Sequence, residues 1–182
     1  MADEEASSPR EIHNNPHFAV VCSFFQRYGL ILGLPDLSFN QLQVWIEDTR
    51  QLNRNFQEIL LKLLRRWKSN VSVDRLEKTL IKFCYTYSQV DAWELEEFGF
   101  QRCKLSTKLR ILKNLVEGQF DFNTKFKEKI NDLTATDLRF LPLGRDSTGL
   151  AYWFLLDNDF NVRVYREQQD DVDSETWEMV VR

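Results

Sequence analysis

Two short acidic stretches have residue types and spacings that could carry chemistry. The stretch Asp-Ser-Thr-Gly at 146–149 matches half of an aspartic-protease signature, but that reaction needs a second carboxylate in the same site. Residues 157–161 supply Asp, Asp and Asn at the first three odd positions of a calcium loop. Val162 replaces the glycine that such a loop needs, and Gln168 replaces its bidentate Glu. We therefore interpret both stretches as hairpin turns.

The other residues that catalysis commonly uses are too few to form a site. His13 and His17 are the only histidines, both near the N-terminus, and neither has a cysteine at zinc-ligand spacing. The sequence has no glycine-rich phosphate loop, and two histidines in a tail support neither a Ser/His/Asp nor a Cys/His arrangement. We expect a protein that is not an enzyme and that uses no metal and no cofactor.

Basic side chains give the chain a second possible chemistry, the binding of phosphates. Residues 62–145 carry 17 basic and 11 acidic side chains, whereas the segments before and after them are net acidic. The candidate DNA-binding residues are Lys62, Arg65, Arg66, Lys68, Arg102, Lys104, Lys108, Arg110 and Lys113. Such clusters neutralise DNA phosphates in a salt-sensitive, sequence-independent way. An ordinary solvated helix face explains each group equally well, so both interpretations stay open.

The turn at 144–149 is followed directly by an aromatic run. Gly144 and Gly149 can adopt positive φ, and the Asp146 carboxylate can fold back onto nearby backbone N–H groups. Tyr152, Trp153 and Phe154 would anchor this turn on the core, so that Arg145 and Asp146 stand on a stiff support. The alternative is a well-made hairpin without a partner. The candidate partner-binding residues are Gly144, Arg145, Asp146, Gly149, Tyr152 and Trp153.

Helical spacing of apolar residues dominates the first 130 positions. Asn15 before Pro16 predicts a helix to about Tyr28, and a Ser38/Gln41 capping box predicts a second one through Ile46. Further helices are expected from Asn55 to Trp67, from Ser72 to Tyr87, from Asp91 with Glu94 as its capping partner to Gly99, from Ser106 to Val116, and from Asp121 to Ile130.

The spacing then changes to the alternation of strands. Residues 138–141, 150–156 and 160–165 predict a three-stranded meander, and residues 177–181 a short returning strand. Helices followed by a small antiparallel sheet have the order of a winged helix, in which the sheet covers the last helix.

Composition limits the remaining possibilities. With 182 residues, of which 43% are hydrophobic, the chain can bury a core of one domain or of two small ones. Its apolar runs are shorter than the roughly 20 residues of a membrane span. The acidic N-terminus lacks the features of a secretory signal. Cys22, Cys84 and Cys103 are an odd number at wide spacing, which indicates buried thiols in a reducing compartment.

Several stretches resemble a known family. FAVVCSFFQRYGLILGLPDLSFNQL and the Leu-rich residues 56–67 resemble a DDT domain. LSTKLRILKNLVEGQF and LRFLPLGRDSTGLAYWFL resemble the two halves of a WHIM motif. Over about residues 16–182 the chain is similar to the N-terminal region of the large subunits of remodelling and spacing factor, which are accessory subunits of ISWI-type chromatin remodellers.

This resemblance implies a non-catalytic subunit. In the family, the WHIM region is associated with holding the ISWI ATPase and with contacting linker DNA between nucleosomes. The family's Gly-x-Asp falls on Gly144 and Asp146, and its aromatic pair on Tyr152 and Trp153. Ser147 stands where the family often has a basic residue. The resemblance also implies that the chain is a fragment, because family members continue into a zinc-binding PHD finger.

We therefore expect a mainly α fold with a small antiparallel β wing. A disordered tail (1–14) would precede a DDT helical domain (15–90), packed as one rigid body on a winged-helix-like WHIM region (91–182). The expected function is to bind an ISWI ATPase and nucleosomal linker DNA in the nucleus, with histones as a further candidate partner. The alternative is a histone- or transcription-factor-binding scaffold that does not touch DNA. No membrane and no small-molecule substrate is expected.

Overall fold

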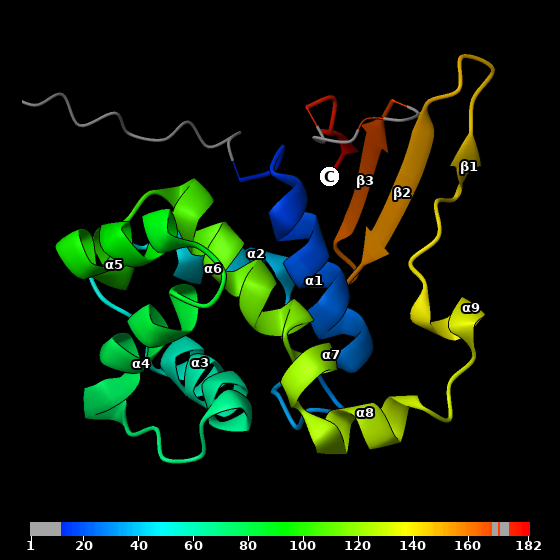
Figure 1. The fold of residues 1–182 in the computed structure, drawn as a ribbon. Helices are drawn as coiled ribbons and strands as arrows, with labels where there is room; N and C mark the ends of the chain where they lie inside the picture. The colour runs from blue at the N-terminus through cyan, green and yellow to red at the C-terminus, as the bar shows by residue number, and fades with distance from the viewer. Residues whose placement is uncertain (1–11, 169–170, 172–174) are drawn as a thin grey trace, which may run out of the picture.

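A computed structural model describes residues 12–168, 171 and 175–182 (Figure 1). The helices are α1 (Pro16–Tyr28), α2 (Phe39–Glu47), α3 (Arg54–Trp67), the single 3-10 turn η1 (Val73–Arg75), α4 (Leu76–Cys84), α5 (Gln89–Arg102), α6 (Leu105–Glu117), α7 (Gln119–Phe122), α8 (Thr124–Ile130) and α9 (Ala135–Leu138). The strands are β1 (Gly144–Arg145), β2 (Ala151–Leu156), β3 (Val162–Glu167) and β4 (Glu178–Val181). The mainly helical fold with a small antiparallel β wing is thus confirmed.

The first two helices begin as the sequence predicts. The Asn15 side chain accepts a hydrogen bond from the His17 N–H, with Pro16 at the first helical position. Ser38 and Gln41 form a complete capping box at α2. For α3 the prediction is wrong by two residues, because Asn53 rather than Asn55 accepts from the N–H groups of the first turn. Of the predicted disordered tail, residues 12–14 form a turn in which Ile12 and His13 are buried, and residues 1–11 lie outside the described part.

The expected capping pair of α5 has other partners. Ser88 caps α5, and the buried Asp91 carboxylate instead accepts from Arg110 of α6. The Glu94 carboxylate accepts from the Lys104 N–H at 2.6 Å and the Thr107 hydroxyl at 2.9 Å, so it caps the start of α6. The predicted cap of α6, Ser106, is therefore wrong. A capping oxygen can come from another helix, which local spacing does not reveal.

The α5 helix is broken where the sequence places its end. Gly99 has φ +74°, a left-handed conformation that favours glycine. The chain then resumes its helical path to Arg102, and the Phe100 N–H donates to the Glu77 carboxylate of α4 at 2.9 Å. The predicted end at Gly99 is thus a kink inside a longer helix. The helix predicted over 121–130 is similarly two helices, α7 and α8, that meet at Asn123.

One hydrophobic core holds both predicted domains together. The apolar face of α6, from Leu109 to Val116, is buried and packs on α1, α2 and α3. Buried residues from Ile12 to Tyr165 belong to a single cluster. The boundary near residue 90 remains a prediction, but it does not separate two cores. Within the described residues, no helix is long and apolar enough to cross a bilayer.

The sheet is a four-stranded meander in the order β1-β2-β3-β4. The strand predicted over 138–141 is wrong. Thr134 and Asp137 form a capping box that starts α9, and the chain reaches β2 only at Gly144 and Arg145, opposite Tyr152 and Ala151. The predicted returning strand is confirmed as β4, which pairs with β3.

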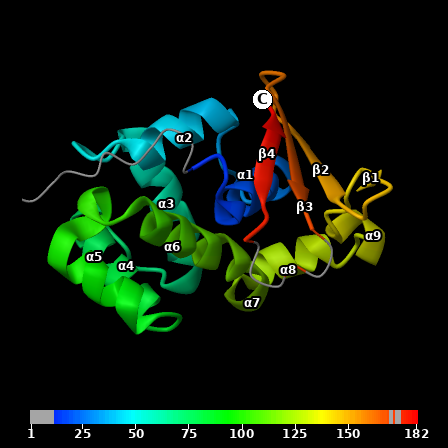
Figure 2. The same cartoon turned by 90° about the horizontal axis from the view of Figure 1, so that it is seen from above.

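The sheet packs on the first helix of the chain rather than on the last one, unlike the expected winged-helix arrangement. Figures 1 and 2 show the strands beside α1, and β2 contacts α1 directly. The Asp157 carboxylate in the β2–β3 turn accepts from the Phe39 N–H at the start of α2 at 2.7 Å. Asp157 also accepts from the Asn161 backbone and side chain, so it organises its own turn, as expected, and fastens that turn to α2.

The fully buried Arg163 of β3 completes this attachment, and nothing in the sequence analysis indicated it. Its guanidinium lies 5.0 Å from the ring centre of Phe18 and 5.6 Å from that of Phe39. Its Nη2 donates to side-chain oxygens of Asn40 at 3.2 Å and Gln43 at 3.3 Å. Two aromatic faces and two amide oxygens thus surround a cation that has no carboxylate within ion-pair distance among the described residues.

His13 lies in the same cluster as a neutral imidazole. Its Nε2 lies 3.0 Å from Nη1 of Arg182 and 3.4 Å from Nε2 of Gln43, and because both partners are donors, Nε2 must accept. Burial, together with the nearby charges of Arg163 and Arg182, lowers the His13 pKa to about 4.

This pKa predicts a loss of stability in mild acid. The unfolded chain takes up a proton near pH 6.5, whereas folded His13 does so only near pH 4, so stability falls as pH drops from about 6.5 to about 4. In His13→Gln, urea unfolding at a series of pH values should show a shallower fall over this window. Part of the slope should remain, because burial also lowers the His17 pKa. An unchanged slope in His13→Gln would contradict this account.

Candidate partner-binding surfaces

The turn between β1 and β2 is organised around the Asp146 carboxylate. Its Oδ1 accepts from the Thr148 N–H at 2.8 Å, the Thr148 hydroxyl at 2.7 Å and the Leu150 N–H at 3.0 Å. Its Oδ2 accepts from the Tyr152 hydroxyl at 3.1 Å. The backbone closes the turn through the Asp146 N–H to Leu150 O and the Gly149 N–H to Asp146 O, both at 3.1 Å. The expected fold-back of this side chain is therefore confirmed.

The two glycines of the turn do not have equivalent roles. Gly149 has φ +89°, as expected for the residue that reverses the chain. Gly144 does not have positive φ, so that expectation is wrong for it, and a Cβ added there would meet no atom within 4 Å. Gly144 thus leaves an open surface beside the turn.

These contacts limit what Asp146 can offer to a partner. The hydrogen bond from the Thr148 hydroxyl is the largest of several that hold the Asp146 pKa below its usual value, so the side chain is a stable anion. A carboxylate has about four lone-pair sites, two on each oxygen. Because, among the described residues, Oδ2 accepts only from Tyr152, it retains one site that can face a donor from outside.

Arg145 is the exposed cation of the same turn. Its Nη1 donates to the Gly149 carbonyl at 3.1 Å, which holds the side chain across the turn. The turn therefore presents a positive and a negative group side by side.

Tyr152 and Trp153 point to opposite faces of β2 and have different roles. Tyr152 supports the carboxylate, whereas Trp153 anchors the strand. The Trp153 ring stacks on Phe140 at 5.5 Å and lies 6.4 Å from Trp177, and its Nε1 donates to Glu167 at 2.8 Å. Aromatic stacking of this kind stabilises beyond the area that it buries. The expected aromatic support of the turn is present for Tyr152 and Trp153. Phe154 is 37% exposed, so its expected anchoring on the core is wrong.

Sequence reasoning missed two residues of this site. Thr148, which gives two of the four hydrogen bonds to Asp146, had a local signal, since an Asp two residues before a Thr is the pattern of an Asx turn. Glu167, which orients the Trp153 indole, had none, because the pairing of β2 with β3 brings it there.

The first group of predicted DNA-binding residues lies exposed on the second half of α3 and just after it. Lys62 donates to the Gly33 carbonyl and Arg65 Nε to the Val71 carbonyl, each at 2.9 Å. Arg66 and Lys68 make no ion pair among the described residues. This part of α3 therefore keeps its full positive charge at the surface.

Most residues of the second group form hydrogen bonds or ion pairs within the molecule. Lys108 is only 2% exposed, and its ammonium donates to the carbonyls of Ile46 at 2.9 Å and Asp48 at 3.4 Å, so it cannot meet a phosphate. Burial also lowers its pKa. Arg110 pairs with the buried Asp91, and Lys113 pairs with Glu117 at 2.8 Å. Arg102 and Lys104 remain exposed.

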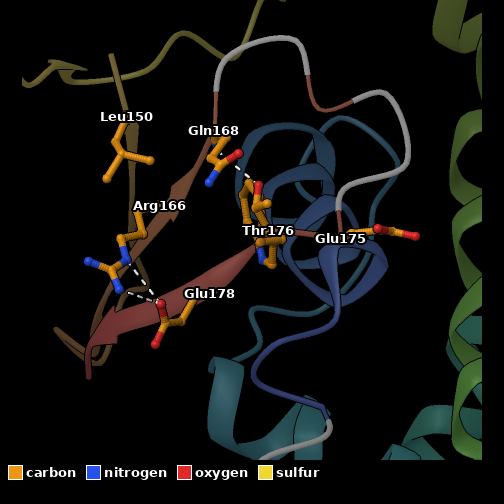
Figure 3. A pocket seen from close by; sticks show the side chains of 7 residues that line it. Leu150, Arg166, Gln168, Glu175, Thr176 and Glu178 are labelled. Carbon is orange, nitrogen blue, oxygen red and sulfur yellow. Dashed lines mark hydrogen bonds and ion pairs between the residues drawn. The ribbon is translucent and has the colours of Figure 1, made fainter. Parts of the chain in front are cut away.

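A hollow lies beside β3 and β4 (Figure 3). It has a volume of about 450 Å³, and Leu150, Arg166 and Thr176 are among the residues that line it. Arg166 pairs with Glu178 at 2.7 Å across its wall, so these two charges compensate each other. Among the described residues there is no group of three or more His, Cys, Asp or Glu that could hold a metal.

The chain is similar to a known chromatin protein. It is 44% identical over 173 residues to Remodeling and spacing factor 1 of Homo sapiens. The alignment covers 92% of this chain but only 12% of that much longer protein. This match confirms the resemblance to remodelling and spacing factor, whereas the DDT domain and the WHIM motif remain predictions. No family model and no solved structure matches the chain.

The geometry of the turn predicts how Asp146 variants behave in amide hydrogen exchange. Asp146→Ala removes the acceptor of the Thr148 and Leu150 N–H groups, so these two amides should exchange at least tenfold faster. Asp146→Asn keeps one oxygen in the position of Oδ1 and should retain most of their protection. Asp159→Ala, an exposed carboxylate in the β2–β3 turn, is the matched control. If Asp146→Ala left both amides protected, the carboxylate would not organise the turn.

Proposed function

We propose that this chain, as a relative of Remodeling and spacing factor 1, is a non-catalytic region of a nuclear chromatin-remodelling factor. In this role it joins an ISWI-type ATPase to nucleosomal linker DNA and so assists nucleosome assembly and spacing. The observation that carries the proposal is the self-supported Asp146 turn, which holds charged groups at the surface at the position of the family's Gly-x-Asp.

The turn suits the docking of a protein because its charges are positioned in advance. The Asp146 carboxylate is held by four hydrogen bonds and Arg145 by one, so little side-chain freedom is lost on binding. The free lone-pair site on Oδ2 favours a donor such as an Arg or Lys of the ATPase. Beside it, Gly144 leaves room for a partner's backbone.

The exposed end of α3 suits a phosphate backbone. Lys62, Arg65, Arg66 and Lys68 follow one another within two helical turns, and no carboxylate of the described residues pairs with them. This surface provides charge without a shape that reads bases, as linker DNA of any sequence requires. Lys108 is not part of the proposal, and Arg102 and Lys104 are its secondary contacts.

The two surfaces lie on different parts of the same body. Figures 1 and 2 show α3 on the helical side and β1 at the far edge of the sheet. Since one core connects them, the chain can hold a motor protein and a DNA segment at a fixed separation.

For the ATPase contact, we expect Asp146→Asn to weaken co-purification with an ISWI-type ATPase at least tenfold, because it removes the charge and keeps the shape of the turn. Asp159→Asn removes an equivalent charge from the β2–β3 turn and should bind as the wild type does. Pull-downs over a range of ATPase concentrations measure the difference. Equal binding by Asp146→Asn and wild type would refute the docking role of Asp146.

For the DNA contact, the change is Arg66→Glu with Lys68→Glu, because these two side chains make no ion pair with another described residue. The salt dependence of binding to a duplex should become shallower by about 2 in log–log slope, since each phosphate contact contributes about 0.9. Arg50→Glu with Arg54→Glu, at the other end of α3, should leave the slope unchanged. Wild-type binding that is insensitive to salt would favour the scaffold that does not touch DNA.

A further inference from the structure

The outer face of α5 carries large apolar side chains that nothing in the described structure covers. Val90 is 65% exposed and Trp93 58% exposed. They are three residues apart, so they are neighbours on one side of the helix. Figures 1 and 2 show α5 at the edge of the molecule, away from the sheet.

Tyr85, in the turn after α4, extends this apolar face. It is 41% exposed, and its hydroxyl donates to Glu96 Oε2 at 2.9 Å. That hydrogen bond raises the Tyr85 pKa. It also holds the phenol beside Glu96, which is three residues from Trp93 and therefore its neighbour on the surface of α5. Single exposed apolar residues are normal on a surface, but here three adjoin one another, two of them aromatic.

The charges along this part of α5 are of one sign. The segment from Gln89 to Phe98 contains four acidic residues and no basic one. Asp91 forms an ion pair with Arg110, and Glu94 accepts a hydrogen bond from the Lys104 N–H just before α6. Glu96 and Glu97 remain exposed, and neither has an ion-pair partner among the described residues.

We propose that the α5 surface, formed by Tyr85, Val90, Trp93, Glu96 and Glu97, binds a basic amphipathic segment of a partner protein. Aliphatic side chains of that segment pack on Val90 and Trp93. Its lysines or arginines meet Glu96 and Glu97 and lie against the aromatic rings. This interaction goes beyond the proposed function, since it uses neither the Asp146 turn nor the basic end of α3.

Charge complementarity selects this occupant over the others. A nucleic acid would place phosphates against two unpaired carboxylates. A symmetric second copy of this chain would bring Glu96 and Glu97 of both copies into one interface without a basic partner, because the same patch meets itself in a two-fold interface. A cationic segment with an apolar side satisfies both parts of the surface.

The test measures binding of a synthetic 18-residue helical peptide with lysine and leucine on opposite faces, by fluorescence anisotropy with the whole chain. Trp93→Ser and Glu97→Lys should each weaken its binding at least tenfold. A peptide in which serine replaces every leucine should bind at least tenfold more weakly to the wild type. Phe160→Ser and Glu128→Lys make the same chemical changes at exposed residues elsewhere, and should bind the first peptide as the wild type does.

Three results would overturn the proposal. The first is a wild-type chain that does not bind the lysine–leucine peptide, and the second is a Trp93→Ser variant that binds it equally well. The third is concentration-dependent self-association in sedimentation that Trp93→Ser abolishes, because a second copy would then cover the surface. Trp93→Ser should bind duplex DNA and the ATPase as the wild type does. A negative result for the α5 surface therefore does not count against the proposed function.

Discussion

The attachment of the β2–β3 hairpin to the first two helices is the constraint on which the rest of the structure depends. The Arg163 guanidinium lies between Phe18 and Phe39, and the Asp157 carboxylate accepts from the first N–H of α2. A buried cation is tolerated only where its surroundings compensate for lost water. Here two aromatic faces and the oxygens of Asn40 and Gln43 do so, and they fix the sheet on the helical body.

The two candidate surfaces of the proposed function inherit their geometry from this attachment. The sheet carries the Asp146 turn at its far edge, and α3 carries exposed cations on the other side of the same core. Binding energy at one end is therefore not lost to movement between two loosely joined parts. The structure also divides the basic residues by role. Lys108 and Arg110 hold helices together, whereas Arg66 and Lys68 keep their charge at the surface.

The sequence predicted well those features that depend on residues close together in the chain. The Asn15 and Ser38 caps, the Gly99 break and the folded-back Asp146 all depend on residues within a few positions of one another. The errors have the opposite origin. Asp91 and Glu94 have cap-like spacing, but tertiary contacts give their carboxylates to α6. Residues 138–141 alternate like a strand, yet the Thr134 box and the stacking of Phe140 on Trp153 decide their structure. The sequence around Arg163 is that of an ordinary strand, because the helices that surround its side chain come from distant parts of the chain.

The Asp157–Phe39 and Arg163–Asn40 contacts join positions about 120 apart in the sequence, which has a consequence for biosynthesis. A chain emerging from the ribosome can form its helices early, but Phe18 and Phe39 receive their cation only after β3 has been translated. Contacts between such distant positions form slowly, because a long loop must close first. Until then, the nascent helical part has an apolar side open to water, where chaperones that recognise such surfaces would bind it.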